Sequence, residues 1–169
     1  MTIGTRRGIL LGGAGLATLA ATTGLLSRGP RAAEGSFEVT HAEEEWRRLL
    51  PPAAFDVLRG HGTEPPGSSP LDAEERPGTY GCAGCDLPLY SSKTKYHSGT
   101  GWPSFWAPLE GAVGTSEDRS WFSVRTEVHC RRCGGHLGHV FDDGPRPTGK
   151  RYCMNGVAMR FVPATRVSS

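Results

Sequence analysis

Two Cys-x-x-Cys pairs constrain the fold of this 169-residue chain more than any other feature. Cys82 and Cys85 form the first pair, Cys130 and Cys133 form the second, and 44 residues separate the pairs. A tight turn at each pair can direct four thiolates toward one tetrahedral ion, the usual geometry of structural zinc. The interval exceeds that of a simple zinc ribbon, so we expect a β-subdomain between the pairs and one structural Zn2+ per chain. Two disulfides are the alternative, which an oxidising compartment would favour.

The remaining cysteine, Cys153, lies outside both pairs. An odd cysteine is a candidate reactive thiol, although a lone cysteine is often only a small buried apolar residue. Glycine and proline number 24 and 13, a composition that favours a turn-rich, mainly β fold over a helical bundle.

The first 33 residues are predicted to be an export signal. Arg6 and Arg7 precede an uncharged stretch at 9–26 that is rich in Gly, Ala and Thr, and basic residues return at Arg28 and Arg31. Adjacent arginines before a mildly apolar segment are typical of twin-arginine export. We therefore expect a periplasmic or other extracytoplasmic protein. An uncleaved leader would instead anchor it, because about 18 apolar residues can span a bilayer.

The charge of the chain argues against a nucleic-acid partner. The formal net charge is +2, but residues 1–33 hold four arginines and no acid, so the remainder has −2. No basic stripe is left for a nucleic acid to follow. We expect a monomer.

Residues 34–78 are interpreted as a linker with short helices and a surface wrap, and 79–165 as the catalytic β domain. Thr40 and Glu43 have the spacing of a capping box for a first helix, and a second helix is expected over 52–58, ending at Gly60. Alternating apolar and polar residues predict a strand at 122–128. Further short strands are expected at 79–82, 87–90 and 157–162.

Three later segments concentrate unusual side chains. They are Gly99–Phe105 with a central Trp102, His136–Phe141 with two histidines, and Arg151–Asn155 around the odd cysteine. Each has an ordinary structural explanation: a turn capped by a core aromatic, or hydrogen-bonded histidines. Asn155-Gly156 could equally be the two-residue turn of a hairpin between 150–154 and 157–162.

Taken in order, these segments and the two cysteine pairs resemble methionine sulfoxide reductases of the B type. The resemblance runs from Glu44-Glu45-Trp46 to Pro163, about 120 residues, and includes Gly62-Thr63-Glu64. It implies a small domain of two antiparallel sheets with peripheral helices, and a zinc ion away from the active site. A non-catalytic, zinc-stabilised β domain that binds a small ligand or a protein is the alternative; it would need no reactive cysteine.

The resemblance also implies roles for individual residues. Cys153 would attack the sulfur of the sulfoxide as a thiolate, which the neighbouring Arg151 would favour. His139 would protonate or hydrogen-bond the sulfoxide oxygen with support from His136, and Asn155 would orient this network.

The expected substrate is the R epimer of methionine sulfoxide, mainly in proteins or peptides. Trp102 would hold the S-methyl group, and Phe105 in the same motif is a second expected substrate-binding residue. Cys153 would be left as a sulfenic acid. Thr100 occupies the position where many family members have a resolving cysteine, so an external thiol, thioredoxin-like or other, would reduce the enzyme.

Overall fold

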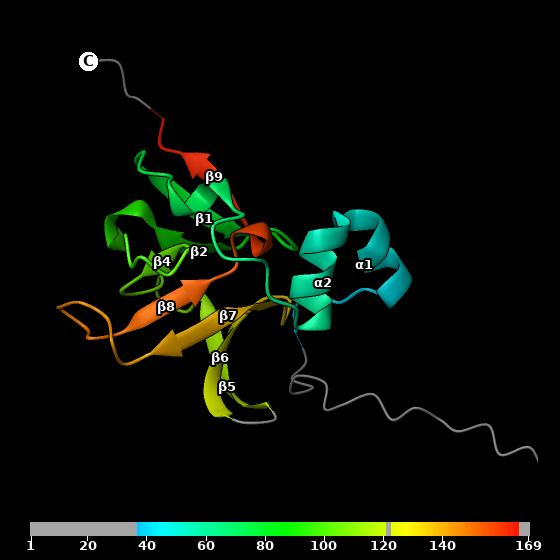
Figure 1. Ribbon diagram of the computed structural model, residues 1–169. Helices are drawn as coiled ribbons and strands as arrows, with labels where there is room; N and C mark the ends of the chain where they lie inside the picture. Colours follow the sequence, from blue (N-terminus) through cyan, green and yellow to red (C-terminus); the bar gives the residue numbers. More distant parts are fainter. Residues whose placement is uncertain (1–36, 121–122, 166–169) are drawn as a thin grey trace, which may run out of the picture. The chain divides into compact units, whose positions relative to one another are not determined.

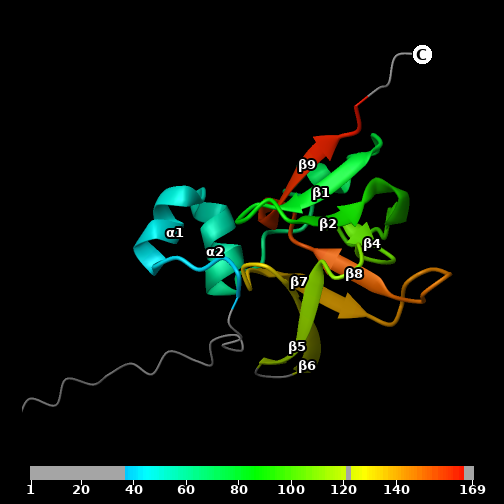
Figure 2. The ribbon, with the colours of Figure 1, turned by 180° about the vertical axis from the view of Figure 1, so that it is seen from behind.

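The computed structural model describes residues 37–120 and 123–165, which form two antiparallel sheets and two short helices (Figures 1 and 2). This confirms the mainly β fold that the sequence predicts. The predicted leader, residues 1–33, lies outside the described residues. Within the described part of the chain, no helix is long and apolar enough to cross a membrane.

The two helices follow each other directly. Helix α1 spans Glu43–Leu49 and α2 spans Pro52–Gly60. The expected capping box at Thr40 is wrong: the N-cap residue is Ala42, and no side chain caps the helix. Three glutamates in the first turn of α1 still favour this start, because they face the positive end of the helix dipole. Helix α2 ends at His61, whose φ of 58° is left-handed.

The smaller sheet has the strand order β2-β1-β9. Strand β1 (Gly78–Cys82) is central, with β2 (Pro88–Ser91) and β9 (Met159–Pro163) at its sides. The predicted hairpin turn at Asn155-Gly156 is wrong, because the strands before and after it belong to different sheets. A short 3-10 helix, Gly156–Ala158, carries the chain from one sheet to the other.

The larger sheet has six strands in the order β3-β4-β8-β7-β6-β5. Strand β6 contains the described part of the predicted alternating segment. The strands are β3 (Lys95–Tyr96), β4 (Ser104–Phe105), β5 (Val113–Ser120), β6 (Ser123–Cys130), β7 (His136–Phe141) and β8 (Arg151–Met154).

Aromatic side chains join the two sheets in the core. Phe105 of β4 stacks on Tyr90 of β2 with ring centroids 4.3 Å apart, and meets Tyr80 of β1 edge-on at 4.9 Å. The Tyr90 hydroxyl donates to the sulfur of Met154 at 3.1 Å. All four residues are fully buried. This packing fixes β8, the strand that contains Cys153, and its neighbour β4 against the smaller sheet.

Candidate active site and metal cluster

The four paired cysteines converge as the sequence predicts. Their sulfur atoms all lie within 4.8 Å of one another, with 3.7 Å between Cys82 and Cys133 and 3.5 Å between Cys85 and Cys130. A disulfide requires about 2.05 Å, whereas a tetrahedral ion with bonds of about 2.3 Å separates its sulfurs by about 3.8 Å. The cluster therefore fits one metal ion and not two disulfides, while the identity of the ion stays a prediction.

The two cysteine pairs have the same local backbone. Asp86 donates its N–H to the Cys82 carbonyl and Gly134 donates to the Cys130 carbonyl, both at 2.9 Å. Both donors have positive φ, 58° for Asp86 and 66° for Gly134. These turns bring the sulfurs of each pair to one side of the chain, which explains why spacing alone identified the cluster.

Cys153 lies in a row of polar side chains that crosses the larger sheet. It is directly opposite Ser104 of β4 and His139 of β7; Tyr96 is in turn opposite Ser104, and Glu127 is opposite His139. Directly opposite residues of antiparallel strands point to the same face of a sheet. The register therefore brings the candidate nucleophile and the candidate acid, distant in sequence, next to each other.

A chain of hydroxyl groups leads to the Cys153 sulfur. Ser104 donates to the Trp102 carbonyl at 3.1 Å, so its oxygen accepts from Ser98, 2.7 Å away. The Thr100 hydroxyl lies 2.8 Å from the Ser98 oxygen and 3.8 Å from the Cys153 sulfur. Because the Ser98 hydrogen is already used, Thr100 donates either to Ser98 or to the sulfur. A thiolate is the stronger acceptor.

His139 is held by an ion-paired carboxylate. Its Nε2 lies 2.8 Å from Asp118, which also accepts from Arg125 at 2.7 Å. The bond to Asp118 makes Nε2 the N–H donor, so Nδ1 is the atom that gains or loses a proton. Burial lowers the pKa of His139 and outweighs the opposing effect of Asp118. Burial raises the pKa of Asp118, but its bonds to His139 and Arg125 reverse the effect and lower it.

His136 is almost completely buried beside Glu127. Its Nδ1 lies 2.8 Å from Glu127 Oε1, and His61 Nδ1 lies 3.2 Å from the same oxygen. Ser116 donates to the other oxygen at 2.5 Å. Burial alone would raise the pKa of Glu127, but the hydrogen bonds from His136, His61 and Ser116 outweigh it and lower the pKa. Glu127 is therefore a buried carboxylate at neutral pH.

Arg151 lies in the same strand, β8, as Cys153. It makes two hydrogen bonds of 2.8 Å to the carboxylate of Asp143 and stacks over the ring of Phe141 at 4.3 Å. The bond to Asp143 raises the pKa of Arg151 despite partial burial, and the nearby Cys153 adds to this effect. Residues two apart in a strand point to the same face of the sheet, so the guanidinium of Arg151 and the sulfur of Cys153 lie on one face of β8.

Glu64 connects two of the predicted site residues. Its carbonyl accepts from the Trp102 indole at 3.0 Å, and its N–H donates to Asn155 Oδ1 at 3.0 Å. Its buried carboxylate accepts from the N–H groups of Gly156 and Val157, the latter at 3.1 Å. Sequence reasoning used Glu64 only as part of a motif and missed this role. No local signal indicated it, because the partners Asn155, Gly156 and Val157 lie about 90 residues further along the chain.

Phe105 does not lie where the sequence analysis placed it. The side chain is fully buried and stacks between the sheets, so this position argues against direct contact with substrate. It follows Ser104 in β4, and adjacent residues of a strand point to opposite faces. Ser104 therefore lies in the row of polar side chains that contains Cys153, and Phe105 faces the core.

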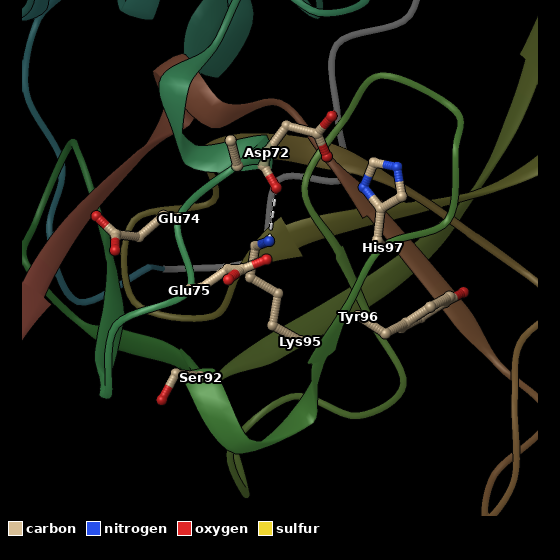
Figure 3. A pocket seen from close by; sticks show the side chains of 8 residues that line it. Asp72, Glu74, Glu75, Ser92, Lys95, Tyr96 and His97 are labelled. Atoms are coloured by element: carbon tan, nitrogen blue, oxygen red, sulfur yellow. Dashed lines mark hydrogen bonds between the residues drawn. The ribbon is translucent and has the colours of Figure 1, made fainter.

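A pocket of about 470 Å³ adjoins the row at the β3 edge. Figure 3 shows Lys95 reaching toward the Asp72 carbonyl, to which it donates at 2.7 Å. Burial lowers the pKa of Lys95. Tyr96 belongs to both the pocket and the row, whereas Cys153 does not line the pocket. The other lining residues are Ala73, Glu74, Glu75, Ser92 and His97.

Comparison with known proteins identifies the family. Residues 50–163 match the model of the SelR domain. The chain therefore belongs to the SelR domain family, and the match includes both cysteine pairs and the whole reactive row.

The most similar relatives all carry the name peptide methionine sulfoxide reductase MsrB. The protein of Pseudomonas putida is 53% identical over 121 residues, which are 71% of this chain and 91% of the relative. That of Methanosarcina barkeri is 52% identical over 124 residues, 73% and 87% of the two chains. That of Leptospira interrogans is 48% identical over 127 residues, 75% and 97%. The chain is thus a member of the MsrB group.

Proposed function

We propose that this protein reduces the R epimer of methionine sulfoxide, mainly in proteins and peptides, with Cys153 as the nucleophile. The observation that carries the proposal is the register of β4, β8 and β7. It places Cys153 between Ser104 and His139 in a chain whose relatives are named for this reaction. The alternative, a non-catalytic binding domain, gives no reason for a half-buried thiol in such a row.

The chemistry follows from the groups around the sulfur. The Cys153 thiolate attacks the sulfoxide sulfur, while a proton reaches the sulfoxide oxygen from protonated His139. The S–O bond of the substrate and the S–S bond formed by the attack then both break as the OH group passes to the Cys153 sulfur. Methionine is reduced, Cys153 is oxidised to sulfenic acid, and the sulfenic acid keeps the proton. Arg151 and the Thr100 hydroxyl favour the thiolate before attack.

Trp102 and Asn155 are proposed to position the substrate and the histidines. The Trp102 indole is fixed by its bond to the Glu64 carbonyl, so one ring orientation is available to the S-methyl group. Asn155 donates to the Leu137 carbonyl at 3.1 Å and accepts from Glu64. Leu137 lies between His136 and His139 in β7, so Asn155 braces the strand that carries both histidines.

An external thiol is proposed to complete the cycle. The hydroxyl of Thr100 lies 3.8 Å from the Cys153 sulfur and cannot form a disulfide, and the other four cysteines belong to the metal cluster. A thiol attacks the sulfenic acid and releases water, and a second thiol then frees Cys153 from the mixed disulfide. A thioredoxin-like protein or a small thiol could supply both.

Zinc is proposed as the ion of the cysteine cluster. Cys82, Cys85, Cys130 and Cys133 would fill all four tetrahedral positions, and a closed site of this kind stabilises the fold without taking part in the reaction. Metal analysis of the purified protein should give one zinc per chain.

We also propose a monomer, exported by the twin-arginine leader in residues 1–33. Sequencing the N-terminus of the exported protein would test cleavage, and light scattering would test the monomer.

The direct test is turnover of racemic methionine sulfoxide with dithiothreitol. The unmodified protein should consume only the R epimer and stop at half conversion, whereas Cys153→Ser should be inactive. Cys153→Ser nearly keeps the size of the side chain, so the variant should fold normally. Its circular dichroism spectrum, compared with that of the unmodified protein, checks this. Equal activity in both proteins would exclude Cys153 as the nucleophile, and an inactive unmodified protein would favour the binding domain.

A further inference from the structure

We propose that His61, Glu127 and His136 form a second metal site, separate from the cysteine cluster, for a divalent ion of the zinc type. One ligand atom of each residue lies within 4.8 Å of the other two. The Nδ1 atoms of His61 and His136 lie 3.2 and 2.8 Å from Oε1 of Glu127. Two imidazoles and a carboxylate are ligands that zinc uses, and with bonds of about 2.0–2.2 Å a tetrahedral ion spaces them by about 3.4 Å. Small adjustments of the side chains would therefore admit an ion.

Three separate elements supply the ligands. His61 ends α2 with left-handed backbone, Glu127 lies in β6, and His136 begins β7. Figures 1 and 2 both show the end of α2 beside the start of β7. The rings of His61 and His136 are 5.0 Å apart and inclined by only 32°. Glu127 and His136 lie on strands and therefore have less freedom to lose when an ion binds, while His61 caps the end of α2.

The electrostatics of this His-Glu-His cluster suit a cation. Glu127 is ionised and 6% exposed, and Ser116 holds its second oxygen. This hydrogen bond is the kind of outer contact that orients a metal-binding carboxylate. The ion would replace the protons that now lie between the carboxylate and the two imidazoles. Binding should therefore release protons and weaken in acid.

His61 makes the site accessible. Its side chain is 39% exposed, whereas that of His136 is 3% exposed. Three protein ligands with one exposed side leave a coordination position for water. Open zinc sites have three protein ligands and a water, unlike the closed four-cysteine cluster.

An ion at this site would inhibit the reductase reversibly. The ring of His136 meets that of His139 edge-on, with ring centroids 5.3 Å apart. An ion on His136 would fix that ring in a new position, and His139 would then be less well placed for the sulfoxide oxygen. This consequence rests on the proposed function, whereas binding of the ion does not.

The test is calorimetric titration of Zn2+ into protein whose cysteine cluster is already loaded with zinc. Cys153→Ser is present throughout, so the reactive thiol cannot serve as a ligand. We expect one further ion per chain, with proton release that two buffers of different ionisation enthalpy reveal. His61→Asn should weaken binding at least tenfold, about 1.4 kcal/mol; asparagine tolerates the left-handed backbone of this position. Glu127→Gln should do the same.

His97→Asn is the matched control, because His97 is an exposed histidine outside the cluster and its loss should leave the second ion unchanged. Absence of a second ion, or equal affinity in His61→Asn, would overturn the proposal. Activity of the chain with Cys153 intact is measured separately, with and without excess Zn2+. Inhibition should be relieved by a chelator and lost in His61→Asn. If the protein binds a second ion but shows no reductase activity even without added zinc, the metal site stands and only the proposed function is refuted.

Discussion

Glu64→Ala should loosen the active site without touching a reacting atom. The carboxylate of Glu64 accepts hydrogen bonds from Gly156 and Val157 at the start of the link between the sheets. Hydrogen bonds to charged groups contribute about 1.5–3 kcal/mol each, so losing both should cost about 3–6 kcal/mol of unfolding free energy. Glu64→Gln can still accept one of the bonds but turns its NH2 group toward the other donor, and should lose about half as much.

The same substitution should reduce catalysis through Trp102 and Asn155. Both are bonded to the backbone of Glu64, and this backbone is held in place by the carboxylate. Misplacement by about 1 Å can cost on the order of 100-fold in rate, so we expect that fall in kcat/KM and weaker discrimination between the sulfoxide epimers.

Urea unfolding and epimer-resolved turnover measure the two effects. Glu75→Gln is the control, because this carboxylate is exposed and its change should alter neither quantity. An unfolding free energy for Glu64→Ala within about 0.5 kcal/mol of the unmodified protein would refute the reasoning, since surface substitutions without structural contacts fall in that range.

Three further predictions follow from individual contacts. Thr100→Val removes the hydroxyl next to the Cys153 sulfur and should lower kcat/KM about tenfold at neutral pH, since one hydrogen bond of about 1.4 kcal/mol is lost. Thr100→Ser keeps the hydroxyl and should retain activity. Equal kcat/KM for Thr100→Val and the unmodified protein would exclude a role for this contact. Burial lowers the pKa values of His129 and His139 below 6.5, so the unfolded chain binds more protons just below that pH. Stability should therefore fall as pH drops through 6.5, with a slope of up to about 1.4 kcal/mol per pH unit for each histidine; His139→Gln should flatten the slope of urea-unfolding energy against pH, and an unchanged slope would contradict the assignment. Cys130→Ser should abolish stoichiometric metal binding and lower the thermal midpoint by more than 10 °C, because binding of a structural ion contributes folding free energy; a metal-free variant that melts with the unmodified protein would show that the cluster is not structural.

Local patterns predicted the parts of the structure that local chemistry decides. The turns at Cys82 and Cys130 depend on a few neighbouring residues, so spacing was sufficient to find the cluster. The helix over 52–60 was equally visible, because Pro52 favours its start and Gly60 its end. Family order predicted roles for Cys153, Trp102, His136 and His139 for a different reason: the resemblance carries information on contacts that spacing does not.

Contacts set by strand register could not be read from the sequence. Glu127 is one of the polar residues in the alternating pattern of β6, which predicts an exposed side chain. The structure buries both Glu127 and its neighbour Val128, because this end of β6 is covered on both faces. Asp118 lies in a polar strand, and nothing local indicates its bond to His139. Asn155-Gly156 has the composition of a hairpin turn, but the Asn155 side chain is used for bonds to Glu64 and Leu137. Long-range bonds decided its conformation.

Cys153 is proposed to take the oxygen of the sulfoxide. A single-turnover experiment tests it most directly: the reduced protein is mixed with excess R-methionine sulfoxide without any thiol, and methionine and protein mass are both measured. We expect one methionine per chain and one added oxygen atom on Cys153, trapped by a sulfenic-acid reagent. Methionine formed without oxygen on Cys153, or no methionine at all, would contradict it.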